Sequence, residues 1–269
     1  MARFEPESYL KYRIAYPSSV FEGLRPWVGS IDGTRGIRAV DLGAGTGFSA
    51  WSMIRALPVS SLILVEPDPS MLEVARATLA DLPVDVEYRV GSAENVAEFA
   101  NSSSVASVDL VLAASSWHWM DPALALGAID RMLRPGGAVF IVEYQFPKLE
   151  TAPAVNEWVR REFNLKWRTE DQRPRGSLLE LTDPVRKSTS FSQRGSVRME
   201  HSQDLTLDEF AGVIRSQSRY LAFESRIPQS GREEERLRMM DQLSKEWGSR
   251  GVIPGSYSLE GYWFVKRWG

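Results

Sequence analysis

Apolar runs alternate with amphipathic segments through the first half of the chain. Runs with the length and pattern of strands lie at residues 39–42, 61–65, 84–90, 108–113 and 138–143. The segments between them space their apolar residues as a helix with one buried face does. Repeated alternation of strand and helix is typical of a parallel sheet covered by helices on both faces. The sequence therefore predicts an α/β fold with a doubly wound, mostly parallel sheet.

Other patterns precede and follow this alternation. Residues 5–28 have the pattern of a helix or a helix pair, in which Tyr9, Tyr12 and Tyr16 would share one face. Beyond the fifth run, the pattern predicts a sixth strand, two helices and a final strand or hairpin at residues 197–205, 206–222, 233–247 and 257–267. The first of these two helices begins with a capping box, Thr206-x-x-Glu209.

A glycine-rich turn follows the first strand-like run. Gly43, Gly45 and Gly47 alternate with small residues directly after Asp41-Leu42. Glycine relieves the steric limits on φ, and because it has no Cβ it lets a ligand lie against the backbone. The open N–H groups of the following helix would face that ligand. The turn indicates a ligand site, although similar turns also serve as plain connections.

An acid ends the second strand-like run. Glu66 lies about 20 residues beyond the glycines, where a nucleotide-binding β-α-β unit carries an acid that accepts hydrogen bonds from ribose hydroxyls. A polar strand end without a ligand is the alternative. The spacing Gly43-x-Gly45-x-Gly47 differs from the Gly-x-Gly-x-x-Gly of a dinucleotide site. Glycines and acid together favour ligand binding, and their spacing argues against a dinucleotide.

Several segments, in order, resemble one known family. Residues 40–47 look like the first motif of the class I S-adenosylmethionine-dependent methyltransferases, and residues 65–72 resemble the second. Residues 133–137 resemble the turn before that family's fifth strand. Residues 9–17 are similar to a segment of the type 11, trans-aconitate-methyltransferase-like members, which act on small molecules. The resemblance implies a Rossmann-like, seven-stranded sheet, S-adenosyl-L-methionine as cofactor and S-adenosyl-L-homocysteine as product.

The resemblance also predicts a single methyltransferase domain over residues 1–269. Its expected parts are an N-terminal helical cover, a cofactor-binding core, a lid insertion before the sixth strand, and C-terminal elements that complete the sheet, at residues 1–30, 37–145, 148–195 and 196–269.

Roles for individual residues follow from the matched motifs. The expected cofactor-binding residues are Tyr12, Arg13, Asp41, Gly43, Ala44, Gly45, Gly47, Glu66, Pro67, Met71, Ala93, Glu94 and Ser115. Asp41 and the glycines would cradle the methionine part, and Glu66 would hold the ribose. The backbone of Ala93 and the carboxylate of Glu94 would meet the adenine. A solvated loop acid or a helix cap is the alternative for Glu94.

An aromatic segment with a histidine follows the fourth strand-like run. Ligands of doubly wound sheets bind at the carboxyl ends of the strands, so Trp117 and His118 fall at the predicted site. His118 is the side chain there best suited to take a proton near neutral pH. Trp117, His118 and Tyr16 would face the acceptor. The alternative is a structural role, in which His118 orders the loop by hydrogen bonding and the tryptophans only contribute packing.

Composition restricts the chemistry. The chain has 269 residues, a formal net charge of −3, no cysteine and two histidines. This net charge gives no reason to expect a nucleic-acid partner. Without cysteine there are no disulfides or thiolates, and two histidines make a histidine-rich metal site implausible, so no metal is predicted. The chain shows no signal-peptide core and no run long enough to span a bilayer, which predicts a cytoplasmic protein without a membrane partner.

Positive charge is concentrated in the expected lid. Residues 160–198 carry ten Lys or Arg and five Asp or Glu, an excess of five positive charges. A basic lid suggests an anionic acceptor such as a carboxylate, although solvated charges with local ion pairs are the commoner explanation. We therefore expect in-line methyl transfer to a small molecule, with the acceptor and the oligomeric state open. The rival functions are cofactor binding without methyl transfer and, less in keeping with the glycines, a nicotinamide-dependent oxidoreductase.

Overall fold

The chain forms two compact units in a computed structural model. The structure describes residues 5–28, 35–98, 107–168 and 176–268. The sheet unit consists of Ala15–Tyr144, Arg175–Met199 and Leu259–Gly269. The helical unit consists of Met1–Ile14, Gln145–Pro174 and Glu200–Ser258. These units group the chain differently from the expected cover, core, lid and C-terminal part, and the single-domain description stays a prediction.

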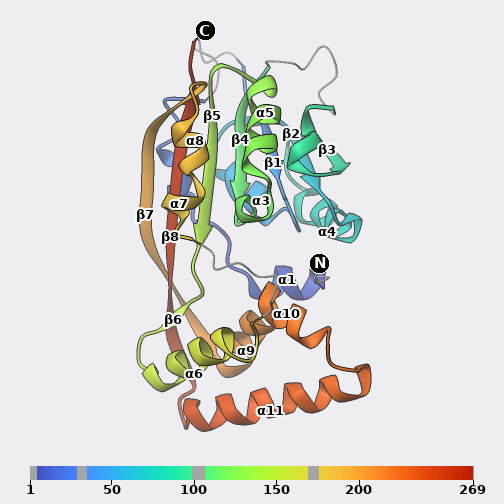
Figure 1. Ribbon diagram of the computed structural model, residues 1–269, viewed down its shortest axis with the longest axis vertical. Coiled ribbons are helices and arrows are strands. Elements are labelled where there is room, and N and C mark those ends of the chain that lie inside the picture. The colour runs from blue at the N-terminus through green and yellow to red at the C-terminus, as the bar shows by residue number, and fades with distance from the viewer. Residues whose placement is uncertain (1–4, 29–34, 99–106, 169–175, 269) are drawn as a thin grey trace. The chain divides into compact units, whose positions relative to one another are not determined.

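Five parallel strands form the centre of the sheet unit, in the order β3-β2-β1-β4-β5 (Figure 1). Their bounds are Ile37–Leu42 for β1, Val59–Glu66 for β2, Asp85–Val90 for β3, Val108–Ala114 for β4 and Leu133–Tyr144 for β5. β1 and β4 are buried almost throughout, as strands covered on both faces are. Since β1 pairs with both β2 and β4, the strand order reverses beside it, and such reversal points are where α/β sheets place ligands.

The sheet ends in antiparallel pairing. β8 (Val252–Lys266) runs antiparallel to β5 and to the two-residue β6 (Lys148–Leu149), and β7 (Phe191–Thr206) also pairs with β8. The doubly wound, mostly parallel sheet is confirmed. It has eight strands where seven were expected, because Lys148–Leu149 adds a short one. β7 also begins at Phe191, six residues before the predicted start.

Of the two alternatives for the C-terminal segment, a strand or a hairpin, the structure has the strand, because β8 is continuous. Two glycines of β8 allow close packing. A Cβ on Gly261 would lie 2.8 Å from the ring of Phe140, and one on Gly255 would lie 2.7 Å from the side chain of Leu205. Glycine in a strand often marks such a close approach.

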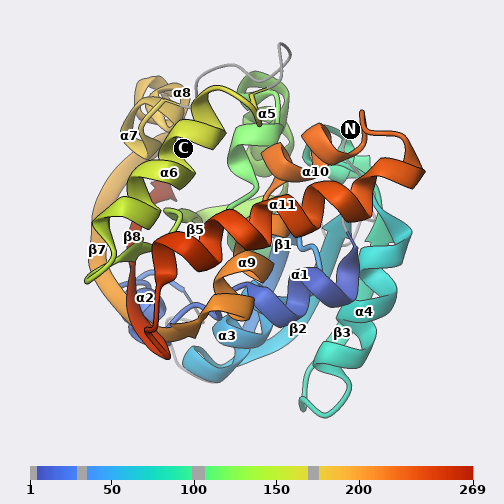
Figure 2. The same cartoon turned by 90° about the horizontal axis from the view of Figure 1, so that it is seen from below.

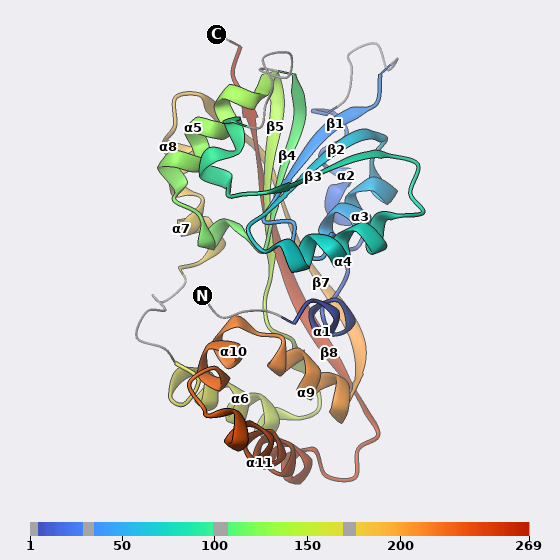
Figure 3. The same cartoon turned by 90° about the vertical axis from the view of Figure 1, so that its right-hand side faces the viewer.

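Helices cover both faces of the sheet (Figure 3). One face carries α2 (Ser19–Glu22) and α3 (Phe48–Ala56), and α4 (Pro69–Leu79) packs against α3. The other face carries α5 (Pro122–Met132), α7 (Leu178–Leu181) and α8 (Asp183–Lys187). Two short 3-10 helices, η1 (Ala93–Glu98) and η2 (Trp117–Trp119), follow β3 and β4.

Asp-Pro pairs begin two of these helices. Asp68 and Asp121 each accept a hydrogen bond from a backbone N–H in the first turn, and Pro69 and Pro122 come next. The first helical position needs no N–H, and the fixed φ of proline suits it. These caps fix where the chain turns back from the carboxyl edge of the sheet.

The helical unit contains five helices within its described residues (Figure 2). They are α1 (Pro6–Tyr12), α6 (Pro153–Asn164), α9 (Leu207–Arg215), α10 (Ser218–Glu224) and α11 (Gln229–Trp247). α9 contacts α1, α10 and α11. An aromatic core of Trp158, Trp167, Phe210, Tyr220 and Trp247 fills the space between them.

Two helix predictions are wrong. α1 ends at Tyr12, so Tyr16 does not continue its face; Tyr16 precedes Pro17, and a residue before proline is disfavoured in a helix. The single helix expected over 206–222 is α9 and α10, separated at Ser216 and Gln217, where Gln217 is extended.

The predicted capping box of α9 is present. The Thr206 hydroxyl accepts a hydrogen bond from the Glu209 backbone N–H at 3.2 Å, and the Glu209 carboxylate accepts one from the Thr206 N–H at 2.8 Å. We expect Thr206→Ala to lower the free energy of unfolding by about 0.5–2 kcal/mol, because it removes one half of this box. Urea denaturation measures the loss. The exposed Thr151→Ala is the control, and an equal change in both variants would contradict the prediction.

Candidate functional site

The three glycines after β1 all adopt left-handed backbone conformations. Their φ values are 68° at Gly43, 55° at Gly45 and 77° at Gly47. A Cβ on Gly43 would lie 2.6 Å from the side chain of Ser116, and one on Gly47 would lie 3.2 Å from Ala75. Beside Gly45 nothing lies within 4 Å. Two of the glycines therefore serve the fold, whereas Gly45 leaves open space against the backbone.

Asp41 is fully buried at the end of β1. The Ser49 hydroxyl donates to its Oδ2 at 2.7 Å, and its Oδ1 has no hydrogen-bond partner among the described residues. Burial raises the pKa of Asp41 to about 7, against the lowering effect of the Ser49 hydrogen bond, and the charge of Glu66 adds to the rise. The turn thus holds a buried acid with unused hydrogen-bonding capacity.

Glu66 is fixed by the same turn. Its carboxylate accepts hydrogen bonds from the Gly45 N–H at 2.9 Å and from the Asp68 N–H at 3.1 Å. Burial raises its pKa, and these two backbone donors lower it. The backbones of Gly43 and Ala44 both donate to the Val65 carbonyl, at 2.8 and 3.1 Å, so the glycine turn and the end of β2 form one hydrogen-bonded unit.

These features fit an adenosyl cofactor. The open side of Gly45 admits a ligand to the backbone, Glu66 presents a fixed carboxylate beside it, and Asp41 holds an unpartnered acceptor. Of the other predicted residues here, Met71 is a buried residue of α4, the helix that follows β2, and Pro67 is exposed.

Glu66→Ala is expected to weaken binding of S-adenosyl-L-homocysteine by about 1.5–3 kcal/mol, because it removes an acceptor for ribose hydroxyls. Calorimetric titration measures the affinity, with the exposed Glu73→Ala of α4 as control. An unchanged affinity in a folded Glu66→Ala protein would place the ribose elsewhere.

Ser115, directly after β4, has a strained backbone conformation. Among the described residues it is the only non-glycine with positive φ, at 50°. The Tyr16 hydroxyl and the Ser115 Oγ lie 2.8 Å apart, and the buried Tyr16 ring meets that of Tyr144 edge-on at 5.5 Å. Strain of this kind persists only where surrounding contacts hold it. The structure therefore brings Tyr16 to the predicted site although α1 does not carry it there.

Beside Ser115, the structure pairs His118 with an acid. The His118 Nδ1 lies 2.7 Å from the Glu143 Oε1, and the two side chains are 6 % and 11 % exposed. Glu143 belongs to β5, which pairs with β4. Sequence reasoning missed Glu143; its only signal was an acid near the carboxyl end of an apolar strand. A carboxylate on one ring nitrogen fixes the tautomer and leaves the other nitrogen able to take a proton.

The remaining predicted residues have identifiable local contacts. Trp117 is buried, and its Nε1 donates to the Leu181 carbonyl at 2.9 Å. Ala93 is buried in the core. Glu94 accepts a hydrogen bond from the Asp121 N–H at 2.8 Å. Burial opposes the shift, but this bond and the Ser92 hydroxyl hold the pKa of Glu94 below its ordinary value. Roles for these residues at the cofactor or acceptor remain predictions.

Tyr12 and Arg13 belong to the helical unit. The Arg13 Nη2 donates to the Ser216 carbonyl at 2.7 Å, and its guanidinium lies 4.8 Å from the Tyr9 ring. The Tyr12 ring covers Gly212, where a Cβ would come within 2.3 Å of it. Their expected contact with the cofactor stays a prediction.

Much of the basic stretch is committed to local contacts. Seven of its ten basic residues have an acid or an aromatic ring as partner: Glu157 for Arg160, Glu162 for Arg161, Glu235 for Lys166, Tyr262 for Arg186, Asp183 for Lys187, Trp27 for Arg194 and Glu260 for Arg198. Arg173 and Arg175 lie outside the described residues. Local pairing therefore accounts for most of the described positive charge.

The described residues form neither a metal site nor a membrane-spanning helix. Within the described ranges, no group of three His, Asp or Glu side chains is placed to hold a metal ion. None of the helices in that part of the chain combines the length and apolar character needed to cross a membrane.

Comparison with known proteins identifies the family. Residues 40–141 match a sequence family described as a methyltransferase domain. An uncharacterized methyltransferase of Mycobacterium tuberculosis is 32% identical over 201 residues, which cover 74% of this chain and 67% of that protein.

Two solved structures share the fold. A protein described as a type II methyltransferase from Anaeromyxobacter dehalogenans has a TM-score of 0.66 at 21% identity, covering 95% of this chain and 98% of the other. Phosphoethanolamine N-methyltransferase 2 of Haemonchus contortus, solved with S-adenosyl-L-methionine, has a TM-score of 0.50 at 17% identity, covering 97% of this chain and 57% of the other. Together with the sequence match, they show that the chain belongs to the S-adenosylmethionine-dependent methyltransferases of class I fold.

Proposed function

We propose that the chain methylates a small molecule at a hydroxyl or amine, and that His118 takes the proton this acceptor loses. The observation that carries the proposal is the 2.7 Å contact between the His118 Nδ1 and the Glu143 Oε1, next to Ser115 at the carboxyl ends of β4 and β5. A hydroxyl must lose its proton as the methyl group is transferred, an amine that is protonated in solution must lose one before its nitrogen can attack, and histidine is suited to accept such a proton near neutral pH.

The cofactor, when bound, supplies a methyl group attached to a sulfonium sulfur. The acceptor attacks this methyl group, and a neutral thioether leaves. The chain's own residues then have three tasks. Glu66, Asp41 and the backbone at Gly45 hold the cofactor. Tyr16 holds Ser115 in its strained conformation. Glu143 keeps a proton on the His118 Nδ1, so that Nε2 accepts the acceptor's proton. Alignment of this kind supplies much of the rate in a displacement reaction.

A carboxylate acceptor is the second candidate, favoured by the excess of positive charge in residues 160–198. A carboxylate is already ionised at neutral pH and needs no base. The rate of its methylation should therefore not depend on His118. Substitution of His118 thus separates the two candidates experimentally.

Transfer of a labelled methyl group from S-adenosyl-L-methionine to pooled phenols, amines and carboxylic acids tests the proposal. We expect label in the phenol or amine pool. Label confined to carboxylic acids would favour the second candidate. Cofactor binding without label in any pool would favour a protein that keeps the site without methyl transfer. That the acceptor is a small molecule and that the protein is cytoplasmic are proposals as well.

A further inference from the structure

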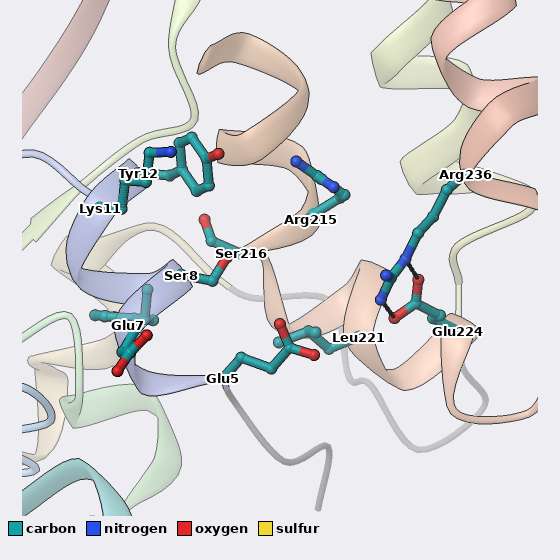
Figure 4. Close-up of a pocket in the computed structure, with 11 residues that line it drawn as sticks. Glu5, Glu7, Ser8, Lys11, Tyr12, Arg215, Ser216, Leu221, Glu224 and Arg236 are labelled. Carbon is teal, nitrogen blue, oxygen red and sulfur yellow. Dashed lines mark hydrogen bonds and ion pairs between the residues drawn. The ribbon is translucent and has the colours of Figure 1, made fainter. Parts of the chain in front are cut away.

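A cavity of about 310 Å³ lies within the helical unit (Figure 4). Its lining comes from the whole length of α1, the end of α9, and the helices α10 and α11. This volume is at the lower end of the range for small-molecule sites. The cavity is formed entirely by residues of the helical unit, whereas Gly45, Glu66 and His118 belong to the sheet unit.

Specific contacts build the wall between α1 and α9. The Arg13 Nη2 donates to the Ser216 carbonyl at 2.7 Å, which fixes the end of α1 to the end of α9. Tyr12 lies flat against Gly212, and any larger residue there would displace its ring. The aromatic ring of Tyr12 and the side chain of Leu221 give the cavity an apolar part.

One pair of charges in the lining is already satisfied. The Arg236 Nε and Nη2 donate to the two carboxylate oxygens of Glu224, at 2.7 and 3.1 Å. Glu224 is buried, and this hydrogen-bonded pair raises the pKa of Arg236. The pair contributes polarity to the cavity but no net charge.

Arg215 and Glu5 also line the cavity, but among the described residues neither forms an ion pair like that of Arg236 and Glu224. Among the described residues, no carboxylate oxygen lies within 4.0 Å of a side-chain nitrogen of Arg215, and its Nε has no hydrogen bond. Glu5 precedes α1 without capping it and has no cation within the same distance in that part of the chain. Figure 4 shows Glu5 across the cavity from Arg215.

We propose that this cavity binds a small zwitterion. Its carboxylate would pair with Arg215, its ammonium with Glu5, and its apolar part would lie against Tyr12 and Leu221. A simple anion would be opposed by Glu5 and a simple cation by Arg215, so a ligand with both charges matches the lining best. Glu7 and Lys11 are also at the cavity and, like Glu5, are exposed; because they carry opposite charges, together they favour neither an anion nor a cation.

Binding of matched probes to the full-length protein tests this inference. L-phenylalanine and 6-aminohexanoate carry both charges at different separations, whereas 3-phenylpropanoate and phenethylamine each carry one. We expect saturable binding of at least one zwitterion by calorimetry or ligand-observed NMR, and binding of the singly charged probes weaker by about tenfold or more. The inference fails if neither zwitterion binds at about 10 mM, or if a singly charged probe binds equally well.

Variants locate the binding. Arg215→Gln and Glu5→Gln should each weaken binding of the zwitterion by about tenfold or more, because each leaves one ligand charge unpaired. Arg238→Gln, on the exposed face of α11, is the matched control and should leave binding unchanged. Equal binding by all four proteins would overturn the inference. Since no step requires methyl transfer, failure here is distinguishable from failure of the proposed function.

Discussion

His118→Ala is expected to slow methyl transfer to a hydroxyl or amine acceptor by about 10²- to 10⁴-fold, the usual contribution of a positioned general base. The side chain is only 6 % exposed and is held by Glu143 at 2.7 Å, so its position is defined before any acceptor arrives. The affinity for S-adenosyl-L-homocysteine should stay unchanged, since the cofactor contacts assigned above do not involve His118. Single-turnover kinetics with labelled cofactor measures the rate.

The controls for this prediction come from the same chain. His201→Ala removes the other histidine, which lies in β7, and should leave the rate unchanged. Glu143→Gln keeps a side chain of similar size but removes the carboxylate that orients the imidazole, and should slow the transfer. A His118→Ala enzyme with the wild-type rate for every acceptor would reject the proton transfer and leave cofactor binding intact.

Asp41→Asn is expected to change how stability depends on pH. The pKa of Asp41 rises from 3.8 to about 7 on folding, chiefly because of burial. Below pH 3.8 the Asp41 carboxyl is protonated in both the folded and the unfolded chain, so its ionisation does not change the free energy of unfolding. As pH rises toward 7, the Asp41 carboxyl ionises in the unfolded chain but not in the folded one, so the free energy of unfolding falls. The loss reaches about 4 kcal/mol above the folded pKa, at about 1.4 kcal/mol per pH unit.

Chemical denaturation between pH 4 and pH 8 measures this effect. Relative to Asp41→Asn, the wild-type free energy of unfolding should fall with rising pH by about 4 kcal/mol over this interval. The test is the difference in pH dependence between wild type and Asp41→Asn. Burying asparagine also changes the free energy of unfolding, but that change does not vary with pH. Parallel curves for the two proteins would show that Asp41 titrates alike in folded and unfolded chains.

The cofactor turn could be predicted because its signal is local. Gly43, Gly45 and Gly47 have left-handed backbone conformations, which favour glycine, so the residue type itself marks the turn in the sequence. Glu66 could also be predicted, since the length of one β-α-β unit fixes its separation from the glycines.

Glu143 could not be predicted, because its role depends on strand register. β5 pairs with β4 over residues that carry no motif, and only that register brings Glu143 to His118. Tyr16 was predicted to face the acceptor from the family resemblance and to share a helix face with Tyr9 and Tyr12, but α1 ends at Tyr12. It reaches Ser115 through an extended segment before Pro17, which helical periodicity does not describe.

The split between α9 and α10 was missed for a similar reason. Residues 206–222 keep a helical pattern, yet the Arg13 side chain donates to the Ser216 carbonyl at the break. A contact from a residue about 200 positions away in the sequence leaves no trace in the local pattern.

Calorimetric titration of the purified chain with S-adenosyl-L-methionine and S-adenosyl-L-homocysteine, at two temperatures, tests the assignment of the cofactor to the turn after β1 most directly. We predict saturable binding of both compounds with one site per chain, weakened in Glu66→Ala and unchanged in Glu73→Ala. Absence of heat at both temperatures, or equal binding by both variants, would contradict it.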